Sequence, residues 1–269
     1  MPMIPDKYPD AQLAYDEALR RIEVCRRDGA AGTELALSHL GLTQVPPEIG
    51  ELTALTELEL DDNDLTCLPP EVCQLPALTG LDLSSNRLTS LPPEIGDLTA
   101  LTWLGLNYNP LASLAPELAR LTALESLCLS NTHFTCLPLE VCALTSLRGL
   151  TCFNSAMTSL PPEIGQLTTL EALHLNNGQI IDLPPEIGAL SALKFLDLAR
   201  NKLTSLPWEM LRLTALTELY LQDNPRLDIP RPVLGPYLHD VHHYDPRQAR
   251  PAARPAEVLE YYFARQGAA

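Results

Sequence analysis

Leucine recurs along this chain in a frame that repeats every 23 residues. The frame L-x-x-L-x-L-x-x-N begins at Leu55, Leu78, Leu101, Leu124, Leu147, Leu170, Leu193 and Leu216. A degenerate first copy begins at Gly32, with Leu35 and Leu37 in frame. The pattern predicts nine tandem repeats over residues 32–234. One repeat is too small to bury its own leucines, so neighbouring repeats must stack.

Each repeat has two halves with different predicted structures. In the first half leucines alternate with other residues, which predicts a short strand with Leu81 and Leu83 inward and Asp82 and Ser84 outward. The second half reads L-P-P-E-I-G in several repeats and is typical of a single helical or 3₁₀ turn, because proline suits a first turn. We therefore expect an α/β solenoid, a horseshoe with a parallel concave sheet, short convex helical or 3₁₀ segments and helical caps.

An asparagine at the ninth frame position is expected to turn inward and bond to buried backbone groups of the bend. It is present at Asn63, Asn86, Asn109, Asn201 and Asn224 and is replaced at Thr132, Ser155 and Gly178. A hydroxyl can make part of these bonds, whereas glycine can make none. The break could reflect a local backbone change that shapes a binding site, or ordinary drift among repeats.

Segments at both ends are predicted to be helical caps. Residues 10–27 would form a helix with Asp10 as its N-cap and Gly29 as a left-handed C-terminal residue, and its apolar face would hold Leu13, Ala14, Ala18, Leu19, Ile22 and Cys25. A second helix would cover residues 256–265 after Pro255, with Val258, Leu259, Tyr262 and Phe263 on one face. Residues 231–254 are expected to be loop. The predicted domains are residues 1–31, an N-terminal cap; 32–234, the repeats; and 235–269, a C-terminal loop and capping helix.

Charge and cysteine content narrow the classes of function. A net charge of −16 repels phosphate backbones and anionic membrane surfaces, so a nucleic-acid partner is not expected. The chain has no run of about 18 apolar residues, so no membrane span is expected. Seven cysteines without a recognisable signal sequence fit a reducing compartment, which predicts a cytoplasmic location.

The leucine frame with L-P-P-E-I-G resembles the leucine-rich-repeat family over about residues 32–234. The repeats are most similar to those of bacterial Roco-type proteins and of Ras-pathway leucine-rich-repeat scaffolds. Residues 14–22 and 255–263 resemble the flanks of the repeats in Roco-type chains, where the second flank precedes a Ras-like GTPase domain. The phosphate loop G-x-x-x-x-G-K-[ST] of such a domain does not occur in this sequence. The resemblance therefore implies a recognition module without enzymatic activity.

Outward strand positions have no packing role and form the candidate binding surface. The early repeats place carboxylates there, at Glu57, Glu59, Asp61, Asp62 and Asp82. The middle and late repeats carry large rings, at Trp103, Tyr108, Phe153, His174, Phe195 and Tyr220. These rings alternate with small polar residues, at Asn107, Ser130, Asn131, Asn154 and Asn176. Exposed rings with adaptable polar neighbours are typical of protein-recognition surfaces, although scattered apolar surface residues can lack any role.

The leading functional prediction is a non-catalytic module that binds a protein partner on the concave face. An acidic end could orient a partner with a basic patch. The alternatives are a regulatory repeat fragment of a Roco-like GTPase signalling protein and a bacterial effector delivered into host cells.

No cofactor or metal is predicted. The pairs Cys67 and Cys73, and Cys136 and Cys142, are more typical of reduced thiols in the core than of a zinc site. The cluster His239, Asp240, His242, His243 and Asp245 falls in the predicted loop.

Overall fold

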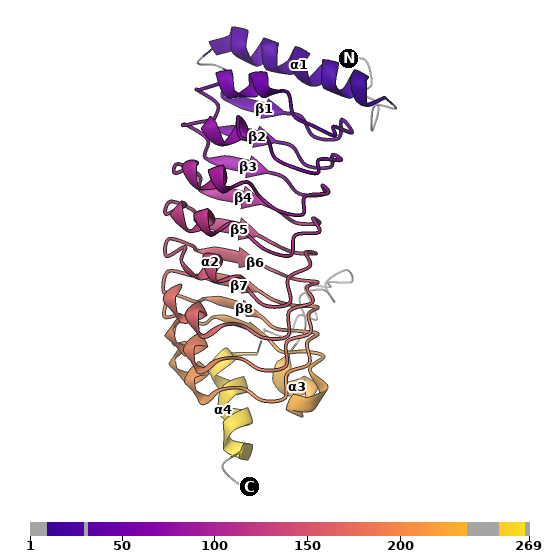
Figure 1. Cartoon of the computed structure of the whole chain (residues 1–269). Coiled ribbons are helices and arrows are strands. Elements are labelled where there is room, and N and C mark those ends of the chain that lie inside the picture. The colour runs from indigo at the N-terminus through magenta and orange to yellow at the C-terminus, as the bar shows by residue number, and fades with distance from the viewer. Residues whose placement is uncertain (1–9, 30–31, 236–252, 267–269) are drawn as a thin grey trace, which may run out of the picture. The chain divides into compact units, whose positions relative to one another are not determined.

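The computed structural model describes residues 10–29, 32–235 and 253–266 and divides into two compact units, Met1–Phe134 and Thr135–Ala269 (Figure 1). In both units a three-residue strand alternates with a short helical return segment. Across the described ranges the strands start every 23 residues, which is the period of the leucine frame.

The first unit begins with α1 (Ala11–Asp28) and contains five strands. These are β1 (Glu34–Ala36), β2 (Glu57–Glu59), β3 (Gly80–Asp82), β4 (Trp103–Gly105) and β5 (Ser126–Cys128). They pair in parallel in chain order, and the frame leucines lie opposite one another in register. The returns are 3₁₀ helices, η2 (Pro47–Glu51), η3 (Val72–Gln74), η4 (Pro93–Asp97) and η5 (Pro116–Arg120).

The second unit contains β6 (Gly149–Thr151), β7 (Ala172–His174), β8 (Phe195–Asp197) and β9 (Glu218–Tyr220), again parallel and in chain order. Its returns are α2 (Leu139–Cys142), η6 (Pro162–Gln166), η7 (Pro185–Ala189), η8 (Trp208–Arg212) and η9 (Pro225–Leu227). The unit ends with α3 (Arg231–Leu234) and α4 (Pro255–Gln266). The predicted fold class, with an open parallel sheet, short helical returns and helical ends, is confirmed. The prediction that residues 231–254 are loop is wrong at its start, where Arg231–Leu234 form the single helical turn α3.

Leucine and isoleucine side chains fill the core between the sheet and the returns. Leu58, Leu81 and Leu104 in the strands are at most 1% exposed, and Ile49 and Ile95 in the returns are fully buried. Burying such a side chain contributes roughly 1.5–3 kcal/mol, so each repeat is stabilised chiefly by its neighbours. The outward strand residues are left for other roles.

The predicted asparagine ladder is confirmed. In the first unit Asn86 accepts a hydrogen bond from Leu65 N at 3.0 Å and donates to Leu60 O at 2.9 Å and Leu83 O at 3.0 Å. In the second unit Asn201 accepts from Ile180 N at 3.0 Å in the same way. Each amide thus satisfies backbone groups of two successive repeats in a buried setting, where an unpaired group is costly.

The three substituted ladder positions differ from one another. Thr132 Oγ1 donates to Leu129 O at 2.8 Å, as predicted. Ser155 Oγ is buried and has no hydrogen-bond partner among the described residues, so the expectation for serine is wrong. At Gly178 a Cβ atom would lie 2.6 Å from Asn201 Oδ1, so glycine leaves room for the next ladder amide.

The bend before the ladder position has the same backbone conformation in every repeat. The residues there have φ of 50–60°, at His39, Asp62, Ser85, Tyr108, Asn131, Asn154, Asn177, Arg200 and Asp223. The repeats that lack the ladder asparagine fall within this range, with φ of 57° at Asn131 and 50° at Asn154. The φ angle at this bend is therefore the same where the ladder asparagine is missing, and a backbone change that shapes a binding site stays a prediction.

The N-terminal helix differs from its prediction in two details. Asp10 is the N-cap and accepts from Gln12 N at 2.8 Å, as expected. Leu13 is 51% exposed and does not belong to the buried face, which consists of Ala14, Ala18, Ile22 and Cys25. Gly29 has φ 56° but ψ −125°, which is outside the left-handed helical region. The buried stripe of α1, which contacts β1 and η2, is narrower than predicted.

The C-terminal helix packs against the last returns of the second unit. Val258, Leu259 and Tyr262 are buried, and the Tyr262 hydroxyl accepts a hydrogen bond from Leu206 N at 3.2 Å. Phe263 is half-buried and packs edge-on against Tyr262 at a centroid distance of 5.1 Å. No helix in the described ranges combines the length and the apolar character needed to cross a membrane. The candidate metal cluster between His239 and Asp245 lies outside the described residues.

Candidate functional site

Carboxylates dominate the outward face of β1 to β3 in the first unit. Glu57 and Glu59 are exposed, and Asp61 and Asp82 are partly exposed. The side chain of Glu57 lies across Gly80, in space that a Cβ atom there would need. Thr79 Oγ1 donates to Glu57 Oε1 at 3.1 Å, which holds this carboxylate on the sheet. The predicted acidic group is thus partly ordered by its neighbours.

The bends next to these strands hold Asp61 and one further carboxylate, Asp62, by hydrogen bonds. Ser38 Oγ donates to Asp61, and the ring Nδ1 of His39 lies 2.5 Å from Asp62 Oδ2. Asp62 occupies the positive-φ position of its repeat, with φ 53°. Asp62 therefore has two roles: it adopts the positive-φ conformation of the bend, and it adds negative charge to the surface.

Trp103 lies along its own strand and covers Gly105. A Cβ atom at position 105 would be 2.9 Å from Trp103 Cη2 and 2.6 Å from Asp82 Oδ1. The missing side chain therefore lets an aromatic ring and a carboxylate converge over β4. No role was predicted for Gly105. An outward glycine two residues after an outward tryptophan could have indicated that the ring lies over it.

Tyr108 is the most exposed of the predicted rings in the first unit, with 55% of its surface accessible. It occupies the positive-φ bend position with φ 54°, where most residues other than glycine, asparagine and aspartate are strained by about 1 kcal/mol or more. A large ring that is both exposed and strained contributes little to folding, which favours a role in binding.

The small polar residues near these rings are more buried than predicted. Asn107 Oδ1 accepts from Ser130 N at 2.9 Å, and Ser130 is fully buried, so its expected exposure is wrong. Asn131 is half-buried, and its Nδ2 atom has no hydrogen-bond partner among the described residues. Asn107 and Ser130 therefore hold successive bends together.

Three rings on the outward face of the second unit form a continuous stack. The His174 and Phe195 ring centroids are 4.4 Å apart, and those of Phe195 and Tyr220 are 5.5 Å apart. They come from β7, β8 and β9. Such pairs each contribute about 0.5–1.5 kcal/mol beyond the burial of area. The sequence predicted separate exposed rings, and the structure joins three of them into one platform.

Burial within this stack corrects part of the prediction. Tyr220 is only 6% exposed, because it packs with Ala199 and Phe195. Its hydroxyl donates to Glu218 Oε2 at 2.8 Å, and burial together with this carboxylate raises the pKa of Tyr220. Burial lowers the pKa of His174, which favours its neutral form. His174 and Phe195 are the members that keep accessible surface.

The other predicted residues of the second unit are divided between surface and interior. Phe153 is half-buried and Asn154 is exposed at its bend. Asn176 is 4% exposed, and its carbonyl accepts from Asn154 N at 3.1 Å, so its expected exposure is wrong. Asn176 is a structural residue of the bend.

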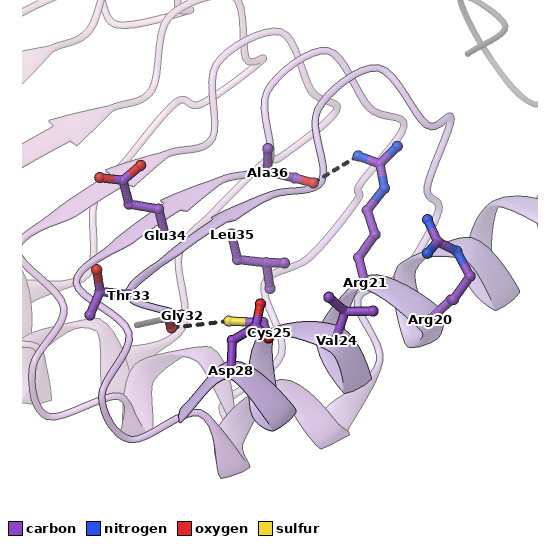
Figure 2. A pocket seen from close by; sticks show the side chains of 10 residues that line it. All are labelled: Arg20, Arg21, Val24, Cys25, Asp28, Gly32, Thr33, Glu34, Leu35 and Ala36. Carbon is purple, nitrogen blue, oxygen red and sulfur yellow. Dashed lines mark hydrogen bonds between the residues drawn. The ribbon is translucent and has the colours of Figure 1, made fainter. Parts of the chain in front are cut away.

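A groove of about 520 Å³ lies between α1 and β1, a site that the sequence did not indicate (Figure 2). Arg21 Nη1 donates to Ala36 O at 2.8 Å, and Cys25 Sγ donates to Gly32 O at 3.1 Å. Figure 2 shows these contacts at two ends of the groove. Because α1 satisfies backbone groups of the edge strand here, the groove is explained by the capping of the sheet edge.

Cys67, Cys73, Cys136 and Cys142 are free thiols, and the two C-x₅-C pairs that they form in the sequence are alike. Cys73 and Cys142 are buried, whereas Cys67 and Cys136 are exposed, so only the second member of each pair lies in the core. Burial raises the pKa of Cys73 and of Cys142 to about 12. Among the described residues, no group of three or more His, Cys, Asp or Glu side chains could hold a metal ion.

These features define a tandem-repeat protein whose strand leucines build the core and whose outward strand residues form a surface. A leucine rich repeat profile matches residues 33–88, 53–111 and 168–225, and a leucine-rich repeat region profile matches residues 93–180. The chain belongs to the leucine-rich repeat family. Neither matching profile is that of a catalytic family. None of the curated proteins matches the sequence.

Solved structures agree with this assignment. A leucine-rich repeat protein of Leptospira interrogans is 39% identical, with a TM-score of 0.72 over 75% of this chain and 51% of the other. The ectodomain of a membrane receptor kinase from Arabidopsis thaliana, in complex with Casparian strip integrity factor 2, is 35% identical, with a TM-score of 0.60 over 68% of this chain and 23% of the other. Internalin C2 of Listeria monocytogenes shares the fold at 23% identity, with a TM-score of 0.66 over 80% and 94% of the two chains. The chain thus spans about half of the Leptospira protein and less of the plant receptor.

Proposed function

We propose that this chain is a non-catalytic module that binds a protein partner on its outward strand residues. The observation that carries the proposal is the set of ordered rings at outward strand positions, where the leucine core needs none. Trp103 is held over Gly105 in the first unit, and His174 and Phe195 are stacked in the second. Rings that are fixed before binding lose little conformational freedom in a complex, which favours affinity.

The similar structures support the same class of function. The Arabidopsis receptor ectodomain was solved in complex with Casparian strip integrity factor 2. The repeats of this chain match that ectodomain at 35% identity. We therefore propose for this chain that it also recognises a protein, and we do not propose the same partner.

The two tryptophans of the chain provide a matched test. Trp103 lies on a strand, whereas Trp208 is 57% exposed in the return segment η8. Affinity capture from the source cell with the wild-type chain identifies a partner, and purified partner is then titrated against Trp103→Ala and Trp208→Ala. We expect Trp103→Ala to weaken binding about tenfold or more, as for a hot-spot residue, and Trp208→Ala to change it less than about twofold.

The melting temperature separates binding from folding in this test. Both variants should melt close to the wild type, because neither tryptophan is part of the buried core. Equal affinities of both variants, or a larger loss in Trp208→Ala, would contradict the proposed surface.

We further propose a cytoplasmic location and, as a second candidate, a regulatory segment of a Roco-like signalling protein. The odd number of cysteines, seven, supports the location, because it fits reduced thiols better than a disulfide framework. The sequence of α4 supports the second candidate, since it resembles the segment before a GTPase domain. Codons downstream of Ala269 that encode a phosphate loop would support a signalling fragment, and a stop codon there would contradict it.

A further inference from the structure

We propose that the outward face of β2 to β4 binds an extended, basic segment of the protein partner, with a lysine or arginine side chain placed on Trp103. This inference rests on the proposed function and specifies the chemistry of the partner in the first unit. The three observations behind it are the charge of the unit, the arrangement around Trp103 and the spacing of the strands that carry these side chains.

The acidic charge of the chain is concentrated in the first unit. Residues 1–134 contain 20 Asp and Glu against seven Lys and Arg, which is −13 of the total −16. The outward strand residues of β1 to β4 include four carboxylates and no Lys or Arg, at Glu34, Ala36, Glu57, Glu59, Gly80, Asp82, Trp103 and Gly105. Arg21, which contacts the end of β1, is paired with Glu17 at 2.8 Å. This face therefore favours a partner of positive charge.

The arrangement around Trp103 is suited to a cation. The ring is held over Gly105, and Asp82 Oδ1 points to the same position. In the parallel register Gly80 lies opposite Trp103, and the carboxylate of Glu57 covers Gly80. A cation on the indole ring would thus have carboxylates beside it, and tryptophan is the best aromatic partner for such a contact.

Two glycines let the recognition side chains lie flat on the sheet. Glu57 occupies the space over Gly80, and Trp103 occupies the space over Gly105 on the adjacent strand. Neighbouring strands are about 4.8 Å apart, so β2 and β4 are separated by about 10 Å, the length of roughly three extended residues. In the polyproline II conformation every third residue faces the same side and lies about 9 Å further along. The strand spacing therefore fits basic residues spaced three apart along a segment of this conformation that crosses the strands.

A defined peptide tests this directly. The probe is a fluorescein-labelled peptide, Lys-Ser-Ser-Lys-Ser-Ser-Lys, with blocked ends, and the comparison peptide has Glu in place of Lys. The protein is the full chain with Trp208→Phe, so that Trp103 is its only tryptophan. Fluorescence anisotropy gives the Kd. Acrylamide quenching of Trp103 emission, measured with the unlabelled peptide, reports whether the ring is covered.

Two double variants with the same net charge distinguish a specific face from general attraction. Glu57→Lys with Glu59→Lys changes the sheet face, and Glu94→Lys with Asp97→Lys changes the return segment η4. We expect the first pair to weaken the Lys peptide about tenfold or more and the second less than about threefold. Binding should also lower the quenching of Trp103, and the Glu peptide should not bind.

Each other outcome counts against the inference. Equal weakening by both pairs would mean attraction to net charge alone, and unchanged quenching would mean that the peptide does not reach Trp103. A protein partner lost on Trp103→Ala, together with a Lys peptide that fails these criteria, would overturn the basic-segment inference and leave the proposed function standing. A partner retained on Trp103→Ala would overturn the proposed function at this face.

Discussion

Trp103 extends toward Gly105, two residues further along β4, so that its Cη2 atom would lie only 2.9 Å from a Cβ atom placed there. This contact explains why an outward strand position carries no side chain. It also orders a large, half-buried ring without using the leucine core.

Gly105→Ala should therefore displace Trp103 and weaken binding of the basic peptide. The new methyl group would also lie 2.6 Å from Asp82 Oδ1, so both side chains must shift. The free energy of unfolding should change by less than about 1 kcal/mol. Alanine is favoured over glycine in a strand by about 0.5–1 kcal/mol, and this gain offsets the cost of crowding Trp103 and Asp82. Peptide anisotropy and thermal melting measure the two effects. Ala36→Ser, at the equivalent position of β1, is the control, and an equal loss of binding there would contradict the explanation.

Tyr108→Asn should stabilise the protein while it weakens partner binding. Asparagine tolerates the left-handed conformation at φ 54°, whereas tyrosine is strained there, so we expect a gain of about 1 kcal/mol in the free energy of unfolding. Urea denaturation measures this gain. Ser85→Asn, at the same bend position of the preceding repeat, should stabilise without loss of binding. A less stable Tyr108→Asn variant would show that the ring packs within the fold.

The ladder residues Asn86 and Ser155 should respond oppositely to alanine substitution. Asn86→Ala leaves Leu65 N and Leu60 O without their partner and should cost about 3 kcal/mol. Ser155→Ala removes a buried hydroxyl that has no hydrogen-bond partner among the described residues, so stability should stay the same or rise by up to about 1 kcal/mol. Urea midpoints of both variants test this pair. A Ser155→Ala variant as damaged as Asn86→Ala would contradict the assigned hydrogen bonding.

Acidification should loosen the ring stack of the second unit through His174. Burial lowers the pKa of His174 in the folded state, so the unfolded chain, with a pKa near 6.5, takes up the proton first as the pH falls. The contribution of neutral His174 to the free energy of unfolding is therefore fully present at neutral pH and decreases as the pH falls below about 6.5. His174→Phe keeps a ring and should lose less stability than the wild type between pH 7 and pH 5. If the wild type and His174→Phe lost the same stability between pH 7 and pH 5, His174 would not be the cause.

Alkaline pH should act on the two buried thiols. Burial raises the pKa of Cys73 and of Cys142 to about 12, so the unfolded chain loses these protons first, from about pH 9 upward. Their contribution to stability is therefore complete below about pH 9 and is lost toward pH 12. At pH 8 a thiol reagent should modify Cys67 and Cys136 rapidly and Cys73 and Cys142 only in denaturant. Rapid modification of Cys73 in the folded protein would contradict its burial.

The leucine period predicted the strands and the core because the side chain at a given frame position points the same way in every repeat. Leu58 and Leu81, for example, could be assigned to the interior from spacing alone. Asn86 could be assigned to the ladder because its partners are backbone groups at fixed distances along the chain. Such features depend on the local frame, which the sequence contains in full.

Exposure of outward residues could not be predicted in the same way. Tyr220 is buried because Phe195 and Ala199 pack against it. Ser130 is fully buried at a bend where its backbone N donates to Asn107 Oδ1. Leu13 is exposed near the start of α1, although Ala14 and Ala18 of the same helix are buried. These outcomes depend on which side chains meet across neighbouring repeats, and the repeat frame does not specify that.

Site-specific photo-crosslinking tests the outward surface most directly. A photoreactive phenylalanine analogue is placed at Ser126 or Ala172 on strands, and at Glu94 or Glu186 on return segments as matched controls. We predict that the strand positions crosslink one discrete protein from the source cell, and that prior addition of the purified partner captured by the wild-type chain removes this product. Crosslinking only from Glu94 or Glu186, with none from the strand positions, would contradict recognition by the outward strand residues.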